Sequence, residues 1–425
     1  MKKWFLVIVL ITCCLGTETS QAENFYMAGA FYQDWMGFKY GDSDFYNRLS
    51  SRLKLTLINR AGEGWTGFID FRNRYTMGEA GKDQFIVYDA RISYDSVKSK
   101  LFFSIGQMNL YDTAGIGQLT GGMVGWKLNK YLSVGGYGGI EPDIYNSRWD
   151  LNYQKYGAFI RYLGHGAKQL SLSYNYLSFE GNTERQYLYT AVMLPVKGIL
   201  VFYGNMEYEL GSGIKNEDKL SRLFFNTRVN LSRFVDVTAN YSSGRGLDYH
   251  RFLLEQSQDP TLQYNEIERY YYSETYGVRL SVKPLKGFRF YVARRQSEQK
   301  DKGIKNHSNQ FGFSAVDLFK SGVSLYGNYT MNRGDASESD SYYISASRNF
   351  GKLSWGLSFS NFYNGIRFID GEAPEILHLP DQKTISTNFF FILNKALAFS
   401  AEYAYSNQPD TSDHQFFIRV IYRKR

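Results

Sequence analysis

The sequence of 425 residues predicts an all-β fold of about 22 antiparallel strands, and three observations support this prediction. Apolar and polar residues alternate, stretch after stretch, from Phe25 to Tyr422. After the N-terminal segment no apolar run reaches about 18 residues, which excludes a helical membrane protein. The chain contains 36 Tyr, 32 Phe and 40 Gly but only 7 Pro, which is unusual for a soluble protein of two or three domains.

The alternation has a period of two residues. In the stretch 53–57 every second residue is Leu, and Lys54 and Thr56 lie between them. The stretches 223–231 and 416–422 repeat the pattern with Phe, Val, Ile and Tyr at the apolar positions. Because successive side chains of a β-strand point to opposite faces of the sheet, each strand is expected to have one apolar and one polar face.

Two kinds of connection separate the predicted strands. Ten short turns rich in Asn, Lys, Gly and Pro alternate with eleven longer and more polar loops. This arrangement predicts an up-and-down barrel of 22 strands, with about 18 as the lower limit because strand boundaries are hard to place. The short turns are predicted at 59–64, 95–99, 129–130, 164–168, 195–198, 232–233, 284–287, 320–322, 349–352 and 394–395. The longer loops include 141–150, 211–218, 243–266, 297–309, 332–340 and 363–382.

The first residues are typical of a secretory signal peptide. Lys2 and Lys3 precede the apolar stretch 4–15, and a small-x-small cleavage site ends at Ala22. A membrane anchor and a lipidated cysteine are the less favoured interpretations of the same segment. We therefore expect residues 1–22 to be a signal peptide.

Residues 23–425 are predicted to form a single domain. The only cysteines, Cys13 and Cys14, are expected to leave with the signal peptide, so the mature chain is expected to contain no disulfide and no thiolate site. Without residues 1–22 the chain has 47 basic and 40 acidic residues, a net charge of +7.

The strand lengths and the position of aromatic residues point to a membrane. The predicted strands of about 10–14 residues are long enough to cross the hydrocarbon layer at a tilt. Tyr and Trp are frequent near strand ends, as expected for membrane interfaces. Since every backbone polar group must be paired in lipid, such a sheet has to close into a transmembrane β-barrel. The short turns are then periplasmic and the longer loops extracellular.

With these features the chain resembles Gram-negative outer-membrane β-barrel proteins over essentially all of its mature length. The glycine-rich stretch 105–122 is similar to a hairpin of many porin-like barrels, although Gln107 stands close to a position where such families often have arginine. Those barrels commonly end on an aromatic residue, whereas here Tyr422 is followed by Arg423, Lys424 and Arg425. The resemblance implies an outer-membrane location and contact with outer-membrane lipid.

No motif for catalysis, a metal, a cofactor or nucleic acid is found. The histidines are His165, His250, His307, His378 and His414, all expected in turns, loops or at a strand edge, without metal-ligand spacing. An outer-rim enzyme using His250 with Asp248, or His414 with Asp413, is a minor alternative. Acidic stretches at 42–44 and 337–340 are interpreted as solvated loops rather than calcium sites. We expect no enzyme, no cofactor and no nucleic-acid partner.

The polar face carries more cations than anions. Eleven arginines are predicted to line the lumen and set its selectivity: Arg52, Arg72, Arg74, Arg91, Arg161, Arg222, Arg228, Arg279, Arg289, Arg295 and Arg419. The same face includes Arg48, Lys54, Lys155 and Arg269, and its acids are Asp70, Asp89, Asp95, Asp236 and Glu402. An unequal charge ring within a low-dielectric wall favours anions. The alternative is that these arginines pair with acids on neighbouring strands and only stabilise the barrel.

We expect a porin-like channel for passive diffusion of small hydrophilic, preferably anionic, solutes. An empty barrel of about 22 strands is wider than porins of 16–18 strands, so the loops 243–266 and 363–382 are candidates to fold inward. The alternative function is a sheath for a periplasmic partner in the lumen, such as a multihaem cytochrome or a polymer exporter. A plugged, energised transporter is disfavoured, since the strand pattern begins at Phe25. The sequence does not decide whether the barrel forms a homo-oligomer. The tyrosines at 270–272 are assigned to the membrane interface rather than to a sugar-stacking track.

Overall fold

The computed structural model is an all-β barrel. The structure describes residues 25–41, 43, 45–59, 64–77, 84–110, 115–142, 149–196, 198–212, 220–245, 272–300, 303–335, 337–368, 375–409 and 411–424. The predicted signal peptide lies outside these residues. No helix in the described part of the chain is long and apolar enough to span a membrane.

The described chain folds into 22 strands and two single 3-10 turns. The strands are β1 (Phe25–Tyr40), β2 (Tyr46–Asn59), β3 (Trp65–Met77), β4 (Gln84–Asp95), β5 (Leu101–Asn109), β6 (Gln118–Lys127), β7 (Leu132–Pro142), β8 (Trp149–Leu163), β9 (Gln169–Phe179), β10 (Asn182–Val196), β11 (Leu200–Ser212), β12 (Leu220–Asn230), β13 (Val235–Arg245), β14 (Tyr272–Val282), β15 (Phe288–Gln299), β16 (Ile304–Ala315), β17 (Val323–Gly334), β18 (Ser337–Asn349), β19 (Leu353–Phe368), β20 (Glu375–Ile392), β21 (Leu397–Gln408) and β22 (Thr411–Lys424). The 3-10 turns are η1 (His165–Ala167) and η2 (Leu318–Lys320).

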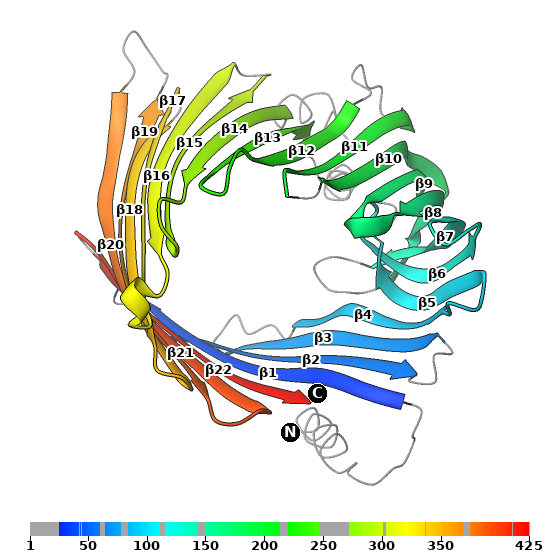
Figure 1. The fold of residues 1–425 in the computed structure, drawn as a ribbon, viewed down its shortest axis with the longest axis horizontal. Coiled ribbons are helices and arrows are strands. Elements are labelled where there is room, and N and C mark those ends of the chain that lie inside the picture. The colour runs from blue at the N-terminus through cyan, green and yellow to red at the C-terminus, as the bar shows by residue number, and fades with distance from the viewer. Residues whose placement is uncertain are drawn as a thin grey trace.

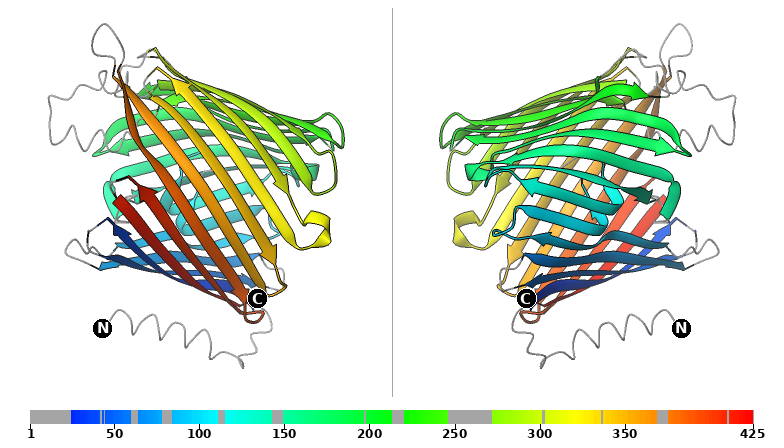
Figure 2. Two further views of the ribbon diagram at one scale, coloured as in Figure 1. Left: turned by 90° about the vertical axis from the view of Figure 1, so that its left-hand side faces the viewer. Right: turned by 90° about the vertical axis from the view of Figure 1, so that its right-hand side faces the viewer.

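The strands form one closed antiparallel sheet (Figure 1). Each strand pairs with the next one along the chain, and β22 returns to pair with β1. This seam is in register from Gly29 opposite Lys424 to Tyr40 opposite Asp413. Figure 2 shows the strands inclined to the barrel axis, as closure of a sheet requires. The predicted all-β, up-and-down barrel of 22 strands is confirmed.

The two faces of the sheet differ in chemistry. Aliphatic side chains on the outer face are widely exposed: Ile92 is 59% exposed, Ile105 64% and Val278 55%. Such exposure of a continuous apolar surface is typical of contact with lipid rather than with water. Positions that alternate with these residues carry Ser, Thr, Asn, Arg, Asp and Glu and form the inner face.

The ten short turns lie where they were predicted, and both ends of the described chain lie on their side of the barrel. The connections on the other side are not all longer, since only Glu180 and Gly181 separate β9 from β10. Three predicted long loops are wrong, however. Much of 297–309, 332–340 and 363–382 belongs to β15–β20, and β20 reaches 18 residues. These strands continue beyond the apolar band, where polar residues occupy both faces, so the alternation fades while the backbone pairing continues. The predicted loop 243–266 lies mainly outside the described residues.

Glycines face each other across the two strands of the β6–β7 hairpin. Gly121 pairs with Gly139 and Gly125 pairs with Gly135. A Cβ at inner-face Gly121 would overlap the carbonyl oxygen of Gly138, whereas a Cβ at outer-face Gly122 would be 3.9 Å from its nearest neighbour. The two backbones therefore approach closely on the inner side of this hairpin, and only glycine fits at position 121.

We expect Gly121→Ala to destabilise the barrel by about 1–3 kcal/mol, because the added methyl group overpacks the inner side of the β6–β7 hairpin. Gly122→Ala is the matched control and is expected to change little. Thermal unfolding of the two purified variants, followed by gel mobility of the folded and unfolded forms, compares them directly. Equal unfolding temperatures for the two variants would show that the β6–β7 hairpin does not need glycine at position 121.

Candidate functional site: the barrel interior

The inner face divides into four regions that are named here by their strands. The first basic wall is the inner face of β22 and β1–β4, and the second basic wall is that of β11–β15. Figure 1 shows these two groups of strands on opposite sides of the ring. The apolar corner is the inner face of β5–β10, and the neutral wall is that of β16–β21.

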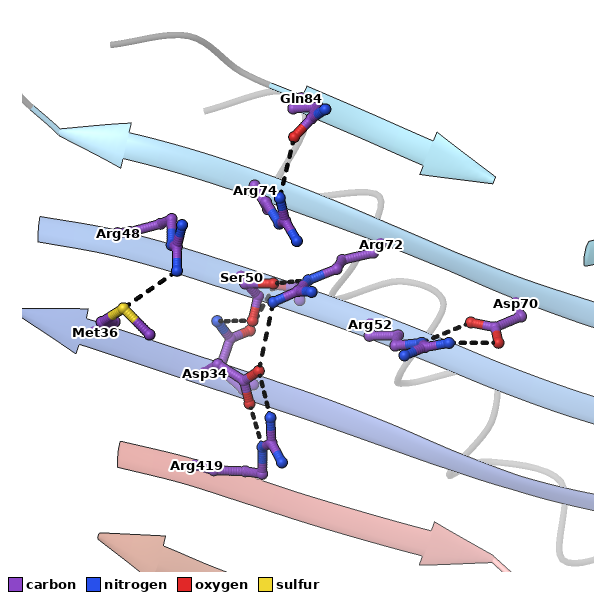
Figure 3. A network of polar contacts seen from close by, with 12 residues as sticks. Asp34, Met36, Arg48, Ser50, Arg52, Asp70, Arg72, Arg74, Gln84 and Arg419 are labelled. Carbon is purple, nitrogen blue, oxygen red and sulfur yellow. Dashed lines mark hydrogen bonds and ion pairs between the residues drawn. The ribbon is translucent and has the colours of Figure 1, made fainter. Parts of the chain in front are cut away.

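The first basic wall holds eight cations and five acids among the described residues. Its cations are Arg48, Arg52, Lys54, Arg72, Arg74, Arg91, Arg419 and Arg423, and its acids are Asp34, Asp70, Asp89, Asp95 and Asp413. Ion pairs join neighbouring strands across this wall (Figure 3). Asp34 accepts two hydrogen bonds from Arg419, of 2.7 and 3.0 Å, across the β1–β22 seam. Asp70 accepts two hydrogen bonds of 2.8 Å from Arg52.

Three arginines of the same wall, Arg48, Arg74 and Arg423, make no ion pair with another described residue, and two of them have neutral partners. Arg48 donates to the Met36 sulfur at 3.1 Å, and Arg74 donates to Gln84 at 3.4 Å (Figure 3). Their charge is therefore not neutralised by a described carboxylate. Among the described residues, the first basic wall combines interstrand ion pairs with an excess of positive charge.

The second basic wall is centred on a buried carboxylate. The Asp236 side chain is only 2% exposed and lies 3.2 Å from Arg228, 2.8 Å from Lys283 and 3.0 Å from Arg289. One carboxylate thus holds cations from three separate segments of the wall. Such a buried carboxylate needs these partners, because removal from water disfavours an unpaired charge.

A second cluster links this wall to the neighbouring corner. Arg185 of β10 lies 2.8 Å from Glu207 and also pairs with Glu209, both on β11. Arg222 of β12 lies 3.7 Å from Glu207. In contrast, Arg279 and Arg295 make no ion pair with another described residue.

The neutral wall carries almost no charge. Glu402 is the single charged side chain on its inner face among the residues whose burial the structure describes, and Ser, Thr, Asn, Gln and Tyr dominate. Hydroxyl groups bond across strands: the Ser358 and Ser386 oxygens are 2.7 Å apart, and those of Thr384 and Ser406 are 2.8 Å apart. This side of the interior offers hydrogen-bonding groups to a solute but little electrostatic attraction.

The apolar corner holds the connection between β5 and β6. Leu110 and Ile116 from this connection are buried with inner-face Tyr137, Tyr187 and Tyr189. These tyrosines belong to β7 and β10, so Leu110 and Ile116 lie inside the ring. Among the described residues, an inward-folding segment is therefore found within the glycine-rich stretch 105–122. The predicted inward loop 243–266 lies mainly outside the described residues.

A buried lysine fastens this connection. The Lys155 amino group donates to the Ile116 carbonyl oxygen at 2.8 Å and lies 2.9 Å from Glu141. Lys155 is 3% exposed. The Leu110 amide also donates to the Gly117 carbonyl oxygen at 2.8 Å. The segment is held by one ion-paired side chain and by apolar packing.

All eleven arginines that the sequence singled out occupy inner-face positions. Seven of them ion-pair with acids: Arg52, Arg72, Arg91, Arg222, Arg228, Arg289 and Arg419. Four make no ion pair with another described residue: Arg74, Arg161, Arg279 and Arg295. Arg161 lies over the Phe102 ring, with 5.7 Å from guanidinium carbon to ring centre. Sequence reasoning missed four inner-face residues of these ion pairs: Asp34, Arg185, Glu207 and Glu209. The two-residue alternation within their strands could have placed them on the inner face.

Several minor alternatives are corrected. His307 and His414 lie within strands rather than loops. His414 and Asp413 are adjacent in β22 and so point to opposite faces, which removes that pair as an acid–base couple. Asp340 lies in β18 and pairs with Arg333 at 2.9 Å. The described residues contain no group of three His, Cys, Asp or Glu side chains that could hold a metal ion. His250 and Asp248 lie outside them.

We expect Lys155→Met to loosen the β5–β6 connection, because Glu141 then loses its cation and the Ile116 carbonyl loses its donor. Hydrogen exchange of the Leu110 amide is expected to become faster. Lys54→Met is the matched control, since Asp70 keeps Arg52 as a partner. If both variants exchange like the unmodified protein, apolar packing alone holds the segment.

No family model and no curated protein matches the chain. Among solved structures it is similar to OpdQ of Pseudomonas aeruginosa, with 8% identity, 94% of this chain and 97% of that chain covered, and a TM-score of 0.43. It is similar to OccAB4 of Acinetobacter baumannii, with 10% identity, coverage of 95% and 99%, and a TM-score of 0.44. The translocation pore of the P pilus usher PapC shows 13% identity, coverage of 94% and 100%, and a TM-score of 0.49. The likeness concerns the barrel fold alone, and the closed 22-strand architecture itself agrees with the porin-like, outer-membrane type of barrel that the sequence resembles.

Proposed function

We propose that the chain is a porin-like channel in the outer membrane of a Gram-negative bacterium. It passes small hydrophilic solutes by passive diffusion and prefers anions. The observation that carries this proposal is a closed barrel with a lipid-type outer face and two arginine-rich walls on opposite sides of a polar interior.

The charge balance supports an anion preference even though many arginines are paired. The first basic wall has eight cations for five acids among the described residues, and the second has five arginines for three acids. The second wall's arginines are Arg222, Arg228, Arg279, Arg289 and Arg295, and its acids are Glu207, Glu209 and Asp236. Lys283, from the adjoining turn, adds to the positive side. Because low-dielectric walls concentrate the field, this excess attracts anions from both sides of the lumen. Pairing and selectivity thus coexist.

The inward segment supports a channel that limits its own width. A barrel of 22 strands is wider than the porins of 16–18 strands, which already hold an aqueous channel. Leu110 and Ile116 fill part of the apolar corner, and the buried Lys155 keeps them there. The remaining passage runs between the basic walls and along the neutral wall.

Single-channel recording of the refolded protein in a planar bilayer tests this function. We expect a steady conductance and, in a KCl gradient, a reversal potential on the anion side. Cation preference would contradict the role of the basic walls. A very large and unstable conductance would instead favour the sheath function, in which a separate protein fills the lumen.

Asp236→Asn is expected to increase the anion preference, because Arg228, Lys283 and Arg289 then lose their shared counter-charge. Asp340→Asn removes the same charge from the outer face and is expected to leave the reversal potential unchanged. The measurement is the chloride-to-potassium permeability ratio of both variants. A decrease or no change for Asp236→Asn would separate that cluster from selectivity.

A further inference from the structure

A cluster at the border of the second basic wall and the neutral wall has the chemistry of a binding site. It consists of Arg279 on β14, Tyr291 on β15, Gln310 on β16, and Tyr326 and Asn328 on β17. We call these five residues the Arg279 site. They come from four consecutive strands and share the inner face, so they are neighbours across the sheet.

Small residues leave room for the large ones. Arg279 stands opposite Ala293, and Tyr291 stands opposite Gly312. A Cβ at Gly312 would overlap the Tyr291 ring, so the tyrosine lies flat across the glycine toward β17. Its hydroxyl group is 3.1 Å from that of Tyr326 and donates to Asn328 at 3.2 Å.

The guanidinium of Arg279 is stacked on this tyrosine. Its central carbon lies 4.5 Å from the centre of the Tyr291 ring. A stacked guanidinium keeps its planar fork of donors free at its edge and is well suited to a carboxylate. Tyr291 therefore sets the orientation of the charge as well as linking it to Tyr326.

Most of the donors remain unused by the described part of the chain. A guanidinium has five N–H groups, and one of them donates to the Gln310 side-chain oxygen at 3.1 Å. Arg279 is exposed and makes no ion pair with another described residue. Arg295 stands diagonally across, opposite Gly277, and adds a second exposed positive charge.

The neutral side of the site offers different contacts. Tyr326 and Tyr343 are 36% and 39% exposed, and their ring centres are 5.7 Å apart. Such exposed rings pack against the apolar face of a sugar ring. The Gln310 amide oxygen accepts from Arg279, and the Asn328 amide oxygen accepts from Tyr291. The N–H groups of both amides can donate to the hydroxyl groups of a solute.

We propose that the Arg279 site binds a monosaccharide acid, such as a hexuronate, on its way through the lumen. The carboxylate pairs with Arg279, the hydroxyl groups bond Gln310 and Asn328, and the ring packs on Tyr326. This inference rests on the proposed channel function and names a solute class for it. The charged and neutral walls then orient one solute whose two ends differ in charge.

Blockade of the ion current by added glucuronate tests the proposal, with glucose and acetate as the matched neutral sugar and plain carboxylate. We expect glucuronate to bind more tightly than either. Arg279→Gln is expected to lower the affinity for glucuronate about tenfold or more, since hydrogen bonds to charged groups are the strong ones. The affinity for glucose should not change. Arg279→Lys should restore only part of the loss, because it keeps the charge but not the fork.

Two further variants separate recognition from the general field. Tyr326→Leu is expected to lower the affinities for glucuronate and for glucose about threefold, because one aromatic contact is lost. Arg74→Gln removes one positive charge from the opposite wall and should change the affinity for glucuronate less than about twofold. If Arg74→Gln and Arg279→Gln weaken glucuronate equally, or acetate binds as well as glucuronate, the site is overturned.

Failure of this inference and failure of the channel function give different results. A protein that conducts anions but does not discriminate glucuronate from acetate keeps the proposed function and loses the Arg279 site. If the protein does not conduct, the channel function fails, and calorimetric titration of the detergent-solubilised barrel with glucuronate still decides the site. Absence of binding in that titration would overturn it.

Discussion

The structure depends on one constraint, the pairing of backbone polar groups between neighbouring strands around a closed ring. A membrane-spanning sheet cannot leave an open edge in lipid, so β22 has to return to β1. The 12 residue pairs from Gly29–Lys424 to Tyr40–Asp413 complete that ring. Closure also fixes which side chains face lipid and which face the interior, because a shift of one residue would exchange the two faces.

The interior follows from the same constraint. Once strands are in register, Arg419 meets Asp34 across the seam and Arg52 meets Asp70 on the next pair of strands. These pairs stabilise the wall, and we propose that the other arginines give it a positive field. At the apolar corner, glycines let β6 and β7 approach closely, and Leu110 and Ile116 from the connection between β5 and β6 pack into the space inside. The basic walls and this connection together shape the passage that we propose for solutes.

Much of the fold could be predicted from the sequence, because strand period, turn composition and the number of turns are local signals. Strand ends could not, since the region around Lys305 and Arg333 is polar on both faces and reads as a loop. The ion pairs depend on the register of strands that are far apart in the sequence, as for Arg419 and Asp34. No local sequence pattern determines that register. Likewise, apolar Leu110 and Ile116 in a glycine-rich loop signal an inward fold only when the tyrosines of β7 and β10 are known to lie opposite.

The central claim is that the inner face lines a water-filled and positively charged passage while the outer face contacts lipid. Outside the predicted signal peptide the chain has no cysteine, so single cysteines at Ser345 and Ile344 report on the two faces of β18. In liposomes, Ser345→Cys is expected to react with water-soluble thiol reagents, and faster with an anionic than with a cationic one. Ile344→Cys is expected to stay unreactive. Equal labelling at both positions, or faster reaction of Ser345→Cys with the cationic reagent, would contradict the account.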